Sequence, residues 1–459
     1  MMSIDISRRL FINSSASMVV AAGSSALLAA SPSASAQTAL TVPGSVSPTD
    51  EMFWSKVADQ YLVSSDIINL ENGYYGMMTK AVMADYQKNI ELLNLHSSYY
   101  LRRTYDDSGL AAVRAQIAKV AGVLPEEIAI TRGATEALQN LITNYKPLKP
   151  GDVAMYADLD YDSTQYAMNY LKERRGATVV SIKMPEPVSR QGVLDAYAAA
   201  FAANPKTRLL LLTHISHRTG FVMPIAEISA LAKARNIDVI VDAAHSWGQI
   251  DFNIPDLNVD FAGFNLHKWM GAPLGVGFLY IRKERLADID RAFADDDWDA
   301  SDIRSRVHSG TTNSANVMTV PAALAAHTQL GAANKQARLR YLRDRWVSQV
   351  RNVKGIEILA PDAPGSYGAI TSFRMTGKVT KADNLAVANE LREKYKIFTV
   401  RRGGVAAGNC VRVSTALFTK PSDLDHLARA LKTWPAPDPD MPDAWQQVGS
   451  QPKKNLSGK

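Results

Sequence analysis

The chain has 459 residues, of which 46% are apolar and 21% are charged, enough material for a large domain together with a smaller one. Its net charge of +6 is mild for this length and shows no basic block, so nucleic acid is not expected as a partner. A single cysteine excludes a disulfide framework within the chain and any cysteine-rich metal site. We therefore expect a fold stabilised by its hydrophobic core, with no metal centre.

The first 36 residues have the features of an export signal. Two arginines, Arg8 and Arg9, precede a moderately apolar run over 18–30, and small residues at 34–36 offer a cleavage site. The run is too short and too rich in Ser, Gly and Ala to span a membrane. The pattern predicts a twin-arginine (Tat) signal peptide, the Tat translocase as a partner during export, and a mature protein in the periplasm. A disordered leader is the alternative.

Residues 37–68 are predicted to form an N-terminal arm with a helix around 52–61. The next motif, Leu-Glu-Asn-Gly-Tyr-Tyr-Gly over 70–76, is a glycine-punctuated aromatic turn. Its tyrosines, Tyr74 and Tyr75, either line a substrate pocket or pack against the fold. A further segment over 99–103 precedes an amphipathic helix, and we expect its arginines, Arg102 and Arg103, to be solvated rather than to bind a substrate carboxylate.

A strand is predicted over 128–131, and a helix opens directly after Gly133. This arrangement favours anion binding, because the free N–H groups and the dipole of a helix N-terminus both attract phosphate. The run over 208–214 reads as a fully buried strand, which is typical of a parallel sheet covered on both faces. In such a sheet, ligands bind beyond the carboxyl ends of the strands.

The most informative stretch surrounds Lys268, in a glycine-rich connection between apolar runs over 259–264 and 278–281. A lysine held there is either a phosphate contact or an amine that reacts with a carbonyl, since burial lowers the proton affinity of an amine. Asp242, at the end of the preceding strand, supplies the carboxylate that pyridoxal phosphate needs on its ring nitrogen. The alternative is that Asp242 caps the next helix and Lys268 is an ordinary loop cation.

Together these motifs resemble the fold-type I pyridoxal-phosphate enzymes of the class V aminotransferase group, which includes cysteine desulfurases and isopenicillin-N-epimerase-like proteins. The resemblance covers the chain from about Asn69 to Trp434. It implies an α/β fold with a large cofactor-binding domain over 69–324, built on a mostly parallel seven-stranded sheet. A smaller α+β domain over 325–434 would follow, entered by a long helix over 325–353, and then a flexible tail over 435–459.

The resemblance also implies roles for individual residues. Lys268 would hold pyridoxal 5'-phosphate as an internal aldimine and act as the catalytic base at the substrate Cα. Ala134, Thr135 and His267 would contact the phosphate of the cofactor. Tyr161 would stack on the face of its ring, and Asp242 would contact the ring nitrogen. His217 and His245 would lie near the phenolic oxygen.

Two further segments complete the implied site. Gly310 and Thr311, in a loop over 308–313, would reach the phosphate of the neighbouring subunit, which implies a homodimer. Arg412 would clamp the α-carboxylate of a small-molecule amino-acid substrate, and Arg218 could project toward the same substrate. The acidic segment over 295–299 is expected to be a solvated turn.

The residues leave transamination, epimerisation and β-elimination open. Cysteine desulfurase activity is disfavoured, because Cys410 lies only two residues before Arg412 on the edge of a strand and because Tyr161 replaces the histidine of desulfurases. The Glu-Asn-Gly-Tyr-Tyr-Gly, Ser-His-Arg-Thr-Gly and Leu-His-Lys-Trp motifs look like those of exported pyridoxal enzymes that mature pyoverdine siderophores at an N-terminal glutamate. This favours a transaminase-type reaction on an amino acid, with a siderophore-linked glutamate as one candidate.

Two other classes fit less well. A nicotinamide enzyme would need a Gly-x-Gly-x-x-Gly turn after the first strand, and the segment at Gly133 does not provide one. A scaffold that binds a cofactor without chemistry is disfavoured by the presence of Lys268, Asp242 and Arg412 together.

Overall fold

The structure, a computed structural model, describes residues 41–433. The predicted signal peptide over 1–36 and the predicted tail over 435–459 lie outside the described residues. In the described part of the chain, no helix combines the length and the apolar character needed to cross a membrane.

The large domain is built on a seven-stranded sheet with the strand order β2-β8-β7-β6-β5-β3-β4. Only β8 runs antiparallel to its neighbours, and every other pair is parallel. The expected α/β fold with a mostly parallel seven-stranded sheet is therefore confirmed. The strands are β2 (Ile128–Thr131), β3 (Val153–Ala157), β4 (Thr178–Ile182), β5 (Thr207–Thr213), β6 (Asp238–Asp242), β7 (Phe261–Asn265) and β8 (Gly277–Ile281).

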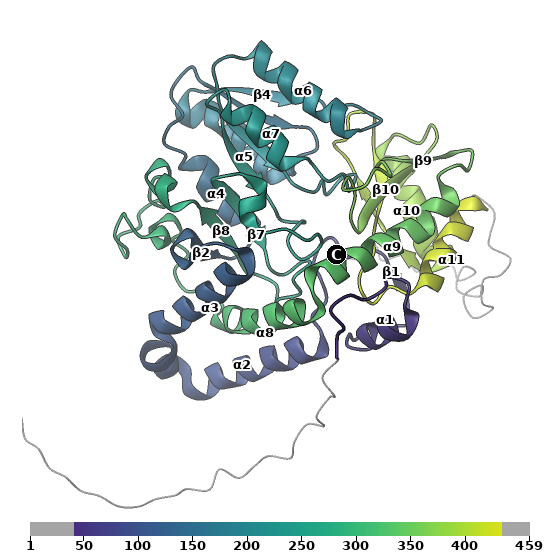
Figure 1. Cartoon of the computed structure of the whole chain (residues 1–459), viewed down its shortest axis with the longest axis horizontal. Coiled ribbons are helices and arrows are strands. Elements are labelled where there is room, and N and C mark those ends of the chain that lie inside the picture. The colour runs from purple at the N-terminus through teal and green to yellow at the C-terminus, as the bar shows by residue number, and fades with distance from the viewer. Residues whose placement is uncertain (1–40, 434–459) are drawn as a thin grey trace, which may run out of the picture. The chain divides into compact units, whose positions relative to one another are not determined.

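Helices cover both faces of this sheet (Figure 1). In the central strand β5, Leu209 and Leu211 face one core, while Leu210 and Leu212 face the other, as the twofold alternation of a strand requires. The first core also takes residues from α4 (Ala134–Thr143) and α5 (Asp162–Arg175). The second takes residues from α3 (Asp106–Ala121), α6 (Arg190–Ala203), α7 (Ile225–Lys233) and α8 (Ser314–Leu330). The apolar run in β5 is thus explained by burial on both sides.

The small domain is a four-stranded antiparallel sheet with the order β12-β13-β10-β9, packed against helices. Its strands are β9 (Ile356–Ile358), β10 (Ile370–Met375), β12 (Val400–Arg402) and β13 (Cys410–Ser414), and its helices are α9 (Ala332–Val350), α10 (Lys381–Tyr395) and α11 (Pro421–Lys432). The N-terminal arm joins this domain, because β1 (Ile68–Asn69) pairs in parallel with β11 (Ile397–Phe398).

The prediction of a single long helix over 325–353 is wrong. The chain forms two helices there, α8 and α9, which are separated by Gly331. Gly331 has a φ of 85°, a left-handed conformation that ends α8 and that glycine adopts without steric cost. The predicted domain boundary after residue 324 therefore falls inside α8.

The remaining described elements are two helices and several short helical turns. The helix predicted around 52–61 is α1 (Glu51–Ala58), and α2 (Lys80–Tyr100) packs alongside α8 (Figure 1). A π-helical turn over Leu101–Tyr105 links α2 to α3, and 3₁₀ turns occur at Pro125–Glu127, Ile254–Leu257, Lys283–Asp288 and Ile303–Arg306.

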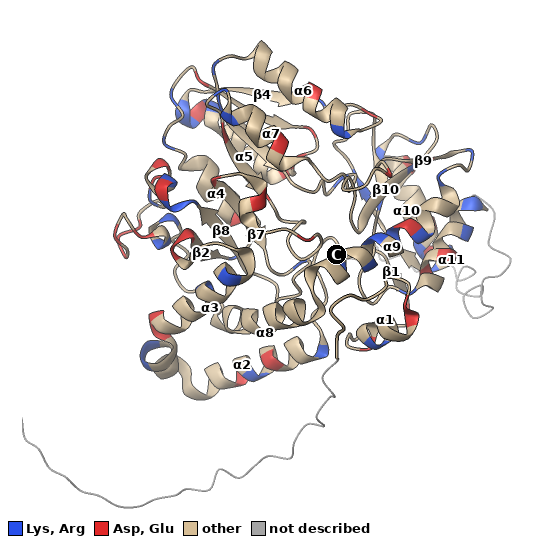
Figure 2. Cartoon of the chain, in the orientation of Figure 1, with Lys and Arg blue, Asp and Glu red and all other residues tan. Residues whose placement is uncertain are grey.

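Two arginines of helix α9 bind helix α1 of the N-terminal arm and helix α11 of the small domain. Arginines are drawn in blue in Figure 2. The buried Arg338 donates to both carboxylate oxygens of Glu51 in α1, at 2.5 and 2.9 Å. Arg345 makes a similar two-bonded contact with Asp425 in α11, at 2.8 and 2.7 Å. These paired contacts fix the direction of α9 between the two other helices.

Candidate active site

A cavity of about 840 Å³ lies where the parallel strands of the large sheet end. Thr213, Asp242 and Asn265, the last residues of β5, β6 and β7, line it. The small domain contributes Arg402 and Arg412 from β12 and β13. The cavity therefore has the position that the sheet topology predicts for a ligand site.

Most of the predicted site residues line this one cavity. They are Tyr74, Ala134, Thr135, Tyr161, His217, Arg218, Asp242, His245, His267, Lys268 and Arg412. Tyr75 does not line it and faces instead a neighbouring cavity of about 470 Å³, which shares Tyr74 and Arg402 with the first. Gly310 and Thr311 are exposed and do not line either cavity, and Arg102 and Arg103 are exposed as expected.

The amine of Lys268 is the chemically distinctive group of the cavity. Burial lowers its pKa from 10.5 to about 7, and the cations Arg412 and Arg402 act in the same direction, while the carboxylate of Asp242 opposes them. The Nζ atom lies 3.0 Å from Nε2 of His245. A large fraction of this amine is therefore neutral near pH 7, so it can act as a nucleophile and as a base.

This shift gives a pH prediction. Because only the neutral amine attacks a carbonyl, the rate at which cofactor-free protein captures pyridoxal phosphate covalently should rise with pH, pass its midpoint near 7 and then level off. The rate is measured from the growth of the visible absorbance band. Nα-acetyl-lysine serves as the control for a fully solvated lysine amine, which has a pKa of about 10.4, and the capture rate of this amine is measured over the same pH range. A midpoint near that of the control would contradict a neutral Lys268.

Asp242 is buried at the carboxyl end of β6 and accepts a hydrogen bond of 2.9 Å from the backbone N–H of Ala244. Burial raises the pKa of its carboxyl group, while that backbone bond and the nearby Lys268 lower it. A buried carboxylate gains from a cationic N–H partner. The residue fits the ring nitrogen of pyridoxal phosphate, the role expected from the sequence.

The N-terminus of α4 fits the cofactor phosphate. Gly133 precedes the helix and brings no side chain to cap it, and a Cβ atom there would lie 3.0 Å from Oδ1 of Asn265 and 3.6 Å from Cε1 of His267. The helix end therefore faces the cavity beside a histidine. The N–H of Ala134, a predicted phosphate contact, is donated to Asn265 in this structure, so the N–H groups from Thr135 onward are the ones that favour an anion. Burial lowers the pKa of His267 to about 4, and its Nδ1 lies 3.3 Å from the carbonyl oxygen of Val276.

Asn265 has a role that the sequence analysis did not assign. Its Oδ1 accepts a hydrogen bond of 2.7 Å from the backbone N–H of Ala134, which fixes the start of α4 against the end of β7. Its position at the end of a buried strand, two residues before His267, was the signal that could have indicated this role.

The wall of the cavity next to Tyr161 contains a buried polar atom without a partner. The Nδ1 atom of His217 is buried and has no hydrogen-bond partner among the described residues. The ring of Tyr161 stands edge-on to that of His217, with centroids 5.1 Å apart. Since buried polar groups in folded proteins are normally paired, this nitrogen indicates a polar ligand in the cavity.

Arg218 is held within the wall. Its guanidinium donates to Oδ1 of Asp162 at 2.6 Å, to the carbonyl oxygen of Asp160 at 3.2 Å and to the carbonyl oxygen of Gly403. It thereby connects the loop after β3 to the small domain. Contact of Arg218 with substrate stays a prediction.

Arg412 is 1% exposed and already has a carboxylate partner. Its Nη2 lies 2.5 Å from Oε1 of Glu71, and its Nη1 donates to the carbonyl oxygen of His217 at 3.0 Å. The second oxygen of Glu71 and the Nε of Arg412 have no partner among the described residues. Arg402 lies 3.6 Å from Glu71, and burial lowers its pKa to about 10. The sequence analysis missed Glu71, although an acid inside a predicted active-site turn was a usable signal.

Two glycines let the turn over 70–76 pass close to the catalytic residues. A Cβ atom on Gly73 would lie 2.6 Å from Nη2 of Arg412, and one on Gly76 would overlap the carbonyl oxygen of Lys268. The N–H of Gly76 donates to the carbonyl oxygen of His267 at 2.9 Å. The turn is therefore part of the site wall, and larger residues at these two positions would displace it.

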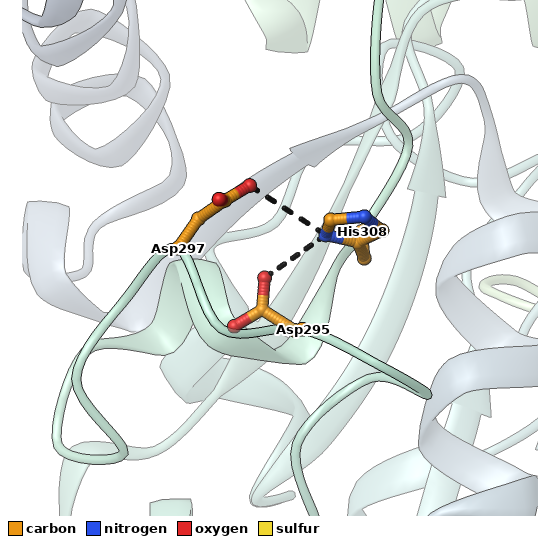
Figure 3. A group of neighbouring side chains, drawn as sticks. All are labelled: Asp295, Asp297 and His308. Atoms are coloured by element: carbon orange, nitrogen blue, oxygen red, sulfur yellow. Dashed lines mark hydrogen bonds and ion pairs between the residues drawn. The ribbon is translucent and has the colours of Figure 1, made fainter. Parts of the chain in front are cut away.

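The acidic segment over 295–299 is not wholly a solvated turn. Asp295 is buried, and its Oδ1 lies 3.1 Å from Nδ1 of His308, with Oδ2 of Asp297 at 3.7 Å from the same nitrogen (Figure 3). The expectation was wrong for Asp295 because a distant histidine and Arg291 supply its partners. Next to His308, Ser309 donates to Glu136 of α4 at 2.6 Å. The start of the loop over 308–313 is thus tied to the phosphate end of the cavity.

Known proteins resemble this chain in sequence. The sequence model described as "Aminotransferase class-V" matches residues 77–427. Isopenicillin N epimerase of Streptomyces clavuligerus is 25% identical over 397 residues, covering 82% of this chain and 97% of that protein. A cysteine desulfurase of Pectobacterium carotovorum is 26% identical over 371 residues, covering 74% and 86%.

Solved structures show the same fold. A mutant of C-DES with glycine covalently linked to its PLP cofactor matches with a TM-score of 0.71 at 21% identity, covering 82% of this chain and 98% of that one. The complex of the cystine C-S lyase C-DES with cysteine persulfide matches with a TM-score of 0.70 at 22% identity, covering 80% and 98%.

Proposed function

The chain belongs to the aminotransferase class-V family and depends on pyridoxal phosphate, and we propose that it acts on the α-amine of an amino acid in a transaminase-type reaction. The observation that carries the proposal is the neutral amine of Lys268, with a pKa of about 7, in one cavity with Asp242 and Arg412. The family and the cofactor expected from the sequence are confirmed.

We assign four cofactor-binding roles to residues of the cavity. Pyridoxal phosphate supplies an aldehyde that links to amines and a protonated ring that withdraws electrons from Cα. Lys268 would bind it covalently, Asp242 would hold the ring nitrogen protonated, and the N-terminus of α4 with His267 would hold its phosphate. Tyr161 would lie on the ring face and keep its plane fixed.

Proton transfer at Cα falls to Lys268. A base is most effective when its pKa lies near the working pH, and this amine has a pKa of about 7. Among the described residues that line the cavity, it is also the only lysine. One base that takes the proton from Cα and delivers it on the same side to the adjoining carbon of the cofactor would suit transamination, whereas epimerisation needs delivery to the opposite side of Cα.

The substrate carboxylate is proposed to bind Arg412 in exchange for Glu71. Arg412→Lys keeps the charge and loses the two parallel bonds of the guanidinium, so the affinity for an amino acid should fall roughly 10- to 100-fold. The affinity is measured from the spectral change of the holoenzyme on titration with the amino acid.

An amine without a carboxylate is the control for Arg412. It should bind the wild type poorly and lose little further in Arg412→Lys, and the absorbance of the resting holoenzyme should not change. Equal losses for the amine and the amino acid would show that Arg412 is structural.

Epimerisation is the second candidate, because isopenicillin N epimerase is a relative over nearly its full length. A cysteine desulfurase is also a relative, which favours sulfur chemistry. The state of Cys410 argues against desulfurase activity, because its thiol is buried and does not line the cavity, and burial raises the pKa of this thiol to about 11. A thiol in that state is a poor nucleophile.

Reaction in D₂O separates the outcomes. Transamination gives a 2-oxo acid from the substrate, matched by amination of the cofactor or of an added oxo acid. Epimerisation gives the opposite enantiomer with deuterium at Cα and no oxo acid. A lyase or desulfurase would release a β-substituent or sulfur from cysteine. Either of the last two results would replace the transaminase proposal.

We further propose that the enzyme is exported by the twin-arginine route to the periplasm, works as a homodimer, and modifies a siderophore-linked glutamate. The support is the sequence of residues 1–36, the exposed loop at Gly310 and Thr311, and the motif likeness described above. Comparison of periplasmic siderophores between the wild type and a deletion strain tests the substrate. Unchanged siderophores in the deletion strain would exclude it.

A further inference from the structure

Trp269 follows Lys268 directly and contacts the same histidine. Its indole Nε1 lies 3.3 Å from Nδ1 of His245, while Nε2 of His245 lies 3.0 Å from Nζ of Lys268. An indole N–H can only donate a hydrogen bond, so Nδ1 of His245 must accept. Burial lowers the pKa of His245 well below its ordinary value, so the ring is neutral. A neutral imidazole whose Nδ1 accepts carries its proton on Nε2.

We propose that Trp269 is a positioning residue that fixes the tautomer of His245, so that the Nε2–H faces the amine of Lys268. An N–H can donate to this amine only when the amine has a free lone pair. The bond therefore stabilises neutral Lys268 and disfavours its protonated form. If the proton moved to Nδ1, Nε2 would become an acceptor and would stabilise the ammonium form instead.

The backbone around both side chains is held in place. The carbonyl oxygen of His245 accepts a hydrogen bond of 2.6 Å from Gln249, and the carbonyl oxygen of Trp269 accepts one of 3.0 Å from Lys335. A Cβ atom on Gly248 would lie 2.8 Å from the carbonyl carbon of Trp269, so the turn after His245 packs directly against Trp269. Trp269 does not line the cavity, and its effect on Lys268 passes through His245.

Other charged groups also act on this pair. Lys268 lies in the field of Asp242, Arg412, Arg402 and Glu71, and its own charge acts on His267. His245 lies in the field of Lys268, Arg412, Arg402 and His217. None of these groups bonds to the indole of Trp269, so a change at Trp269 leaves them in place and isolates its contribution.

The test uses Trp269→Phe, which keeps an aromatic ring and removes the N–H. Cofactor-free protein labelled with ¹⁵N-histidine is studied by NMR, because the shifts of the two ring nitrogens report which one carries the proton. His245→Gln assigns the signal. The wild type should show His245 protonated at Nε2, and Trp269→Phe should show a substantial population protonated at Nδ1.

The pH dependence of covalent capture is the second measurement. In Trp269→Phe the midpoint for capture of pyridoxal phosphate should move to higher pH by roughly half a unit to one unit, the size expected for one hydrogen bond. Trp247→Phe is the matched control, since that indole is buried against Phe264 and Phe278 rather than bonded to His245. Its midpoint should stay at the wild-type value.

Either measurement can overturn the proposal. Protonation of His245 at Nδ1 in the wild type would refute it even if Trp269→Phe failed to fold. An unchanged tautomer and midpoint in a folded Trp269→Phe would refute it as well. The NMR result does not depend on which amino acid the enzyme converts, so failure of the proposed reaction would leave this test intact.

Discussion

Replacing Lys268 by alanine is expected to abolish all measurable turnover and the visible absorbance band of the bound cofactor. The reason is that the neutral amine of Lys268 supplies both the covalent link to the cofactor and the base at Cα, and no other lysine among the described residues lines the cavity. The fold should persist, because the lysine side chain is itself bonded only to His245. Turnover, absorbance and circular dichroism are measured on the same preparation.

Lys335 offers a matched control for this substitution. It is also buried with a pKa of about 7, but it contacts His327 and the carbonyl oxygen of Trp269 and lies outside the cavity. Lys335→Met should lose stability and keep the absorbance band. A band that survives in Lys268→Ala and disappears in Lys335→Met would reverse the assignment.

Replacing Asp242 by asparagine is expected to lower turnover by about 100-fold or more. Asparagine keeps the shape and removes the charge that holds the ring nitrogen protonated, and each ~1.4 kcal/mol lost from transition-state stabilisation is a factor of ten. Single-turnover kinetics measure the chemical step directly. Because Asp242 raises the pKa of Lys268, the midpoint for cofactor capture should also move to lower pH.

Asp160 serves as the control for Asp242. It is also a buried carboxylate, with a pKa raised to about 7 by burial, but it accepts hydrogen bonds from the backbone N–H groups of Ala157 and Thr213 and does not line the cavity. Asp160→Asn should reduce stability more than the rate of the chemical step in the protein that remains folded. Near-normal turnover in Asp242→Asn would show that the ring is not used to withdraw electrons.

Much of the large domain could be predicted because its signals are local. The apolar runs at β5, β7 and β8 are long enough to indicate strands buried on both faces, and residues at the ends of parallel strands meet at one edge of a sheet. Asp242 and Lys268 were therefore identifiable as members of one site from their places at strand ends. The family resemblance added the histidines and Tyr161.

Features that depend on distant partners were not predictable in this way. The acid at Glu71 pairs with Arg412, more than three hundred residues further along the chain, and no local pattern shows such a pair. Asp295 looked like part of a solvated acidic turn, but His308 and Arg291 bury and pair it. The break between α8 and α9 was visible as Gly331, yet one glycine in a helical pattern does not by itself require a helix to end.

The most direct test of the account is to identify the lysine that carries the cofactor. The holoenzyme is reduced with borohydride, which makes the link between cofactor and amine permanent, and the protein is digested and its peptides are mapped by mass spectrometry. The account requires the modified residue to be Lys268. An adduct on Lys335, or on any other lysine with Lys268 unmodified, would contradict the assignment of the active site.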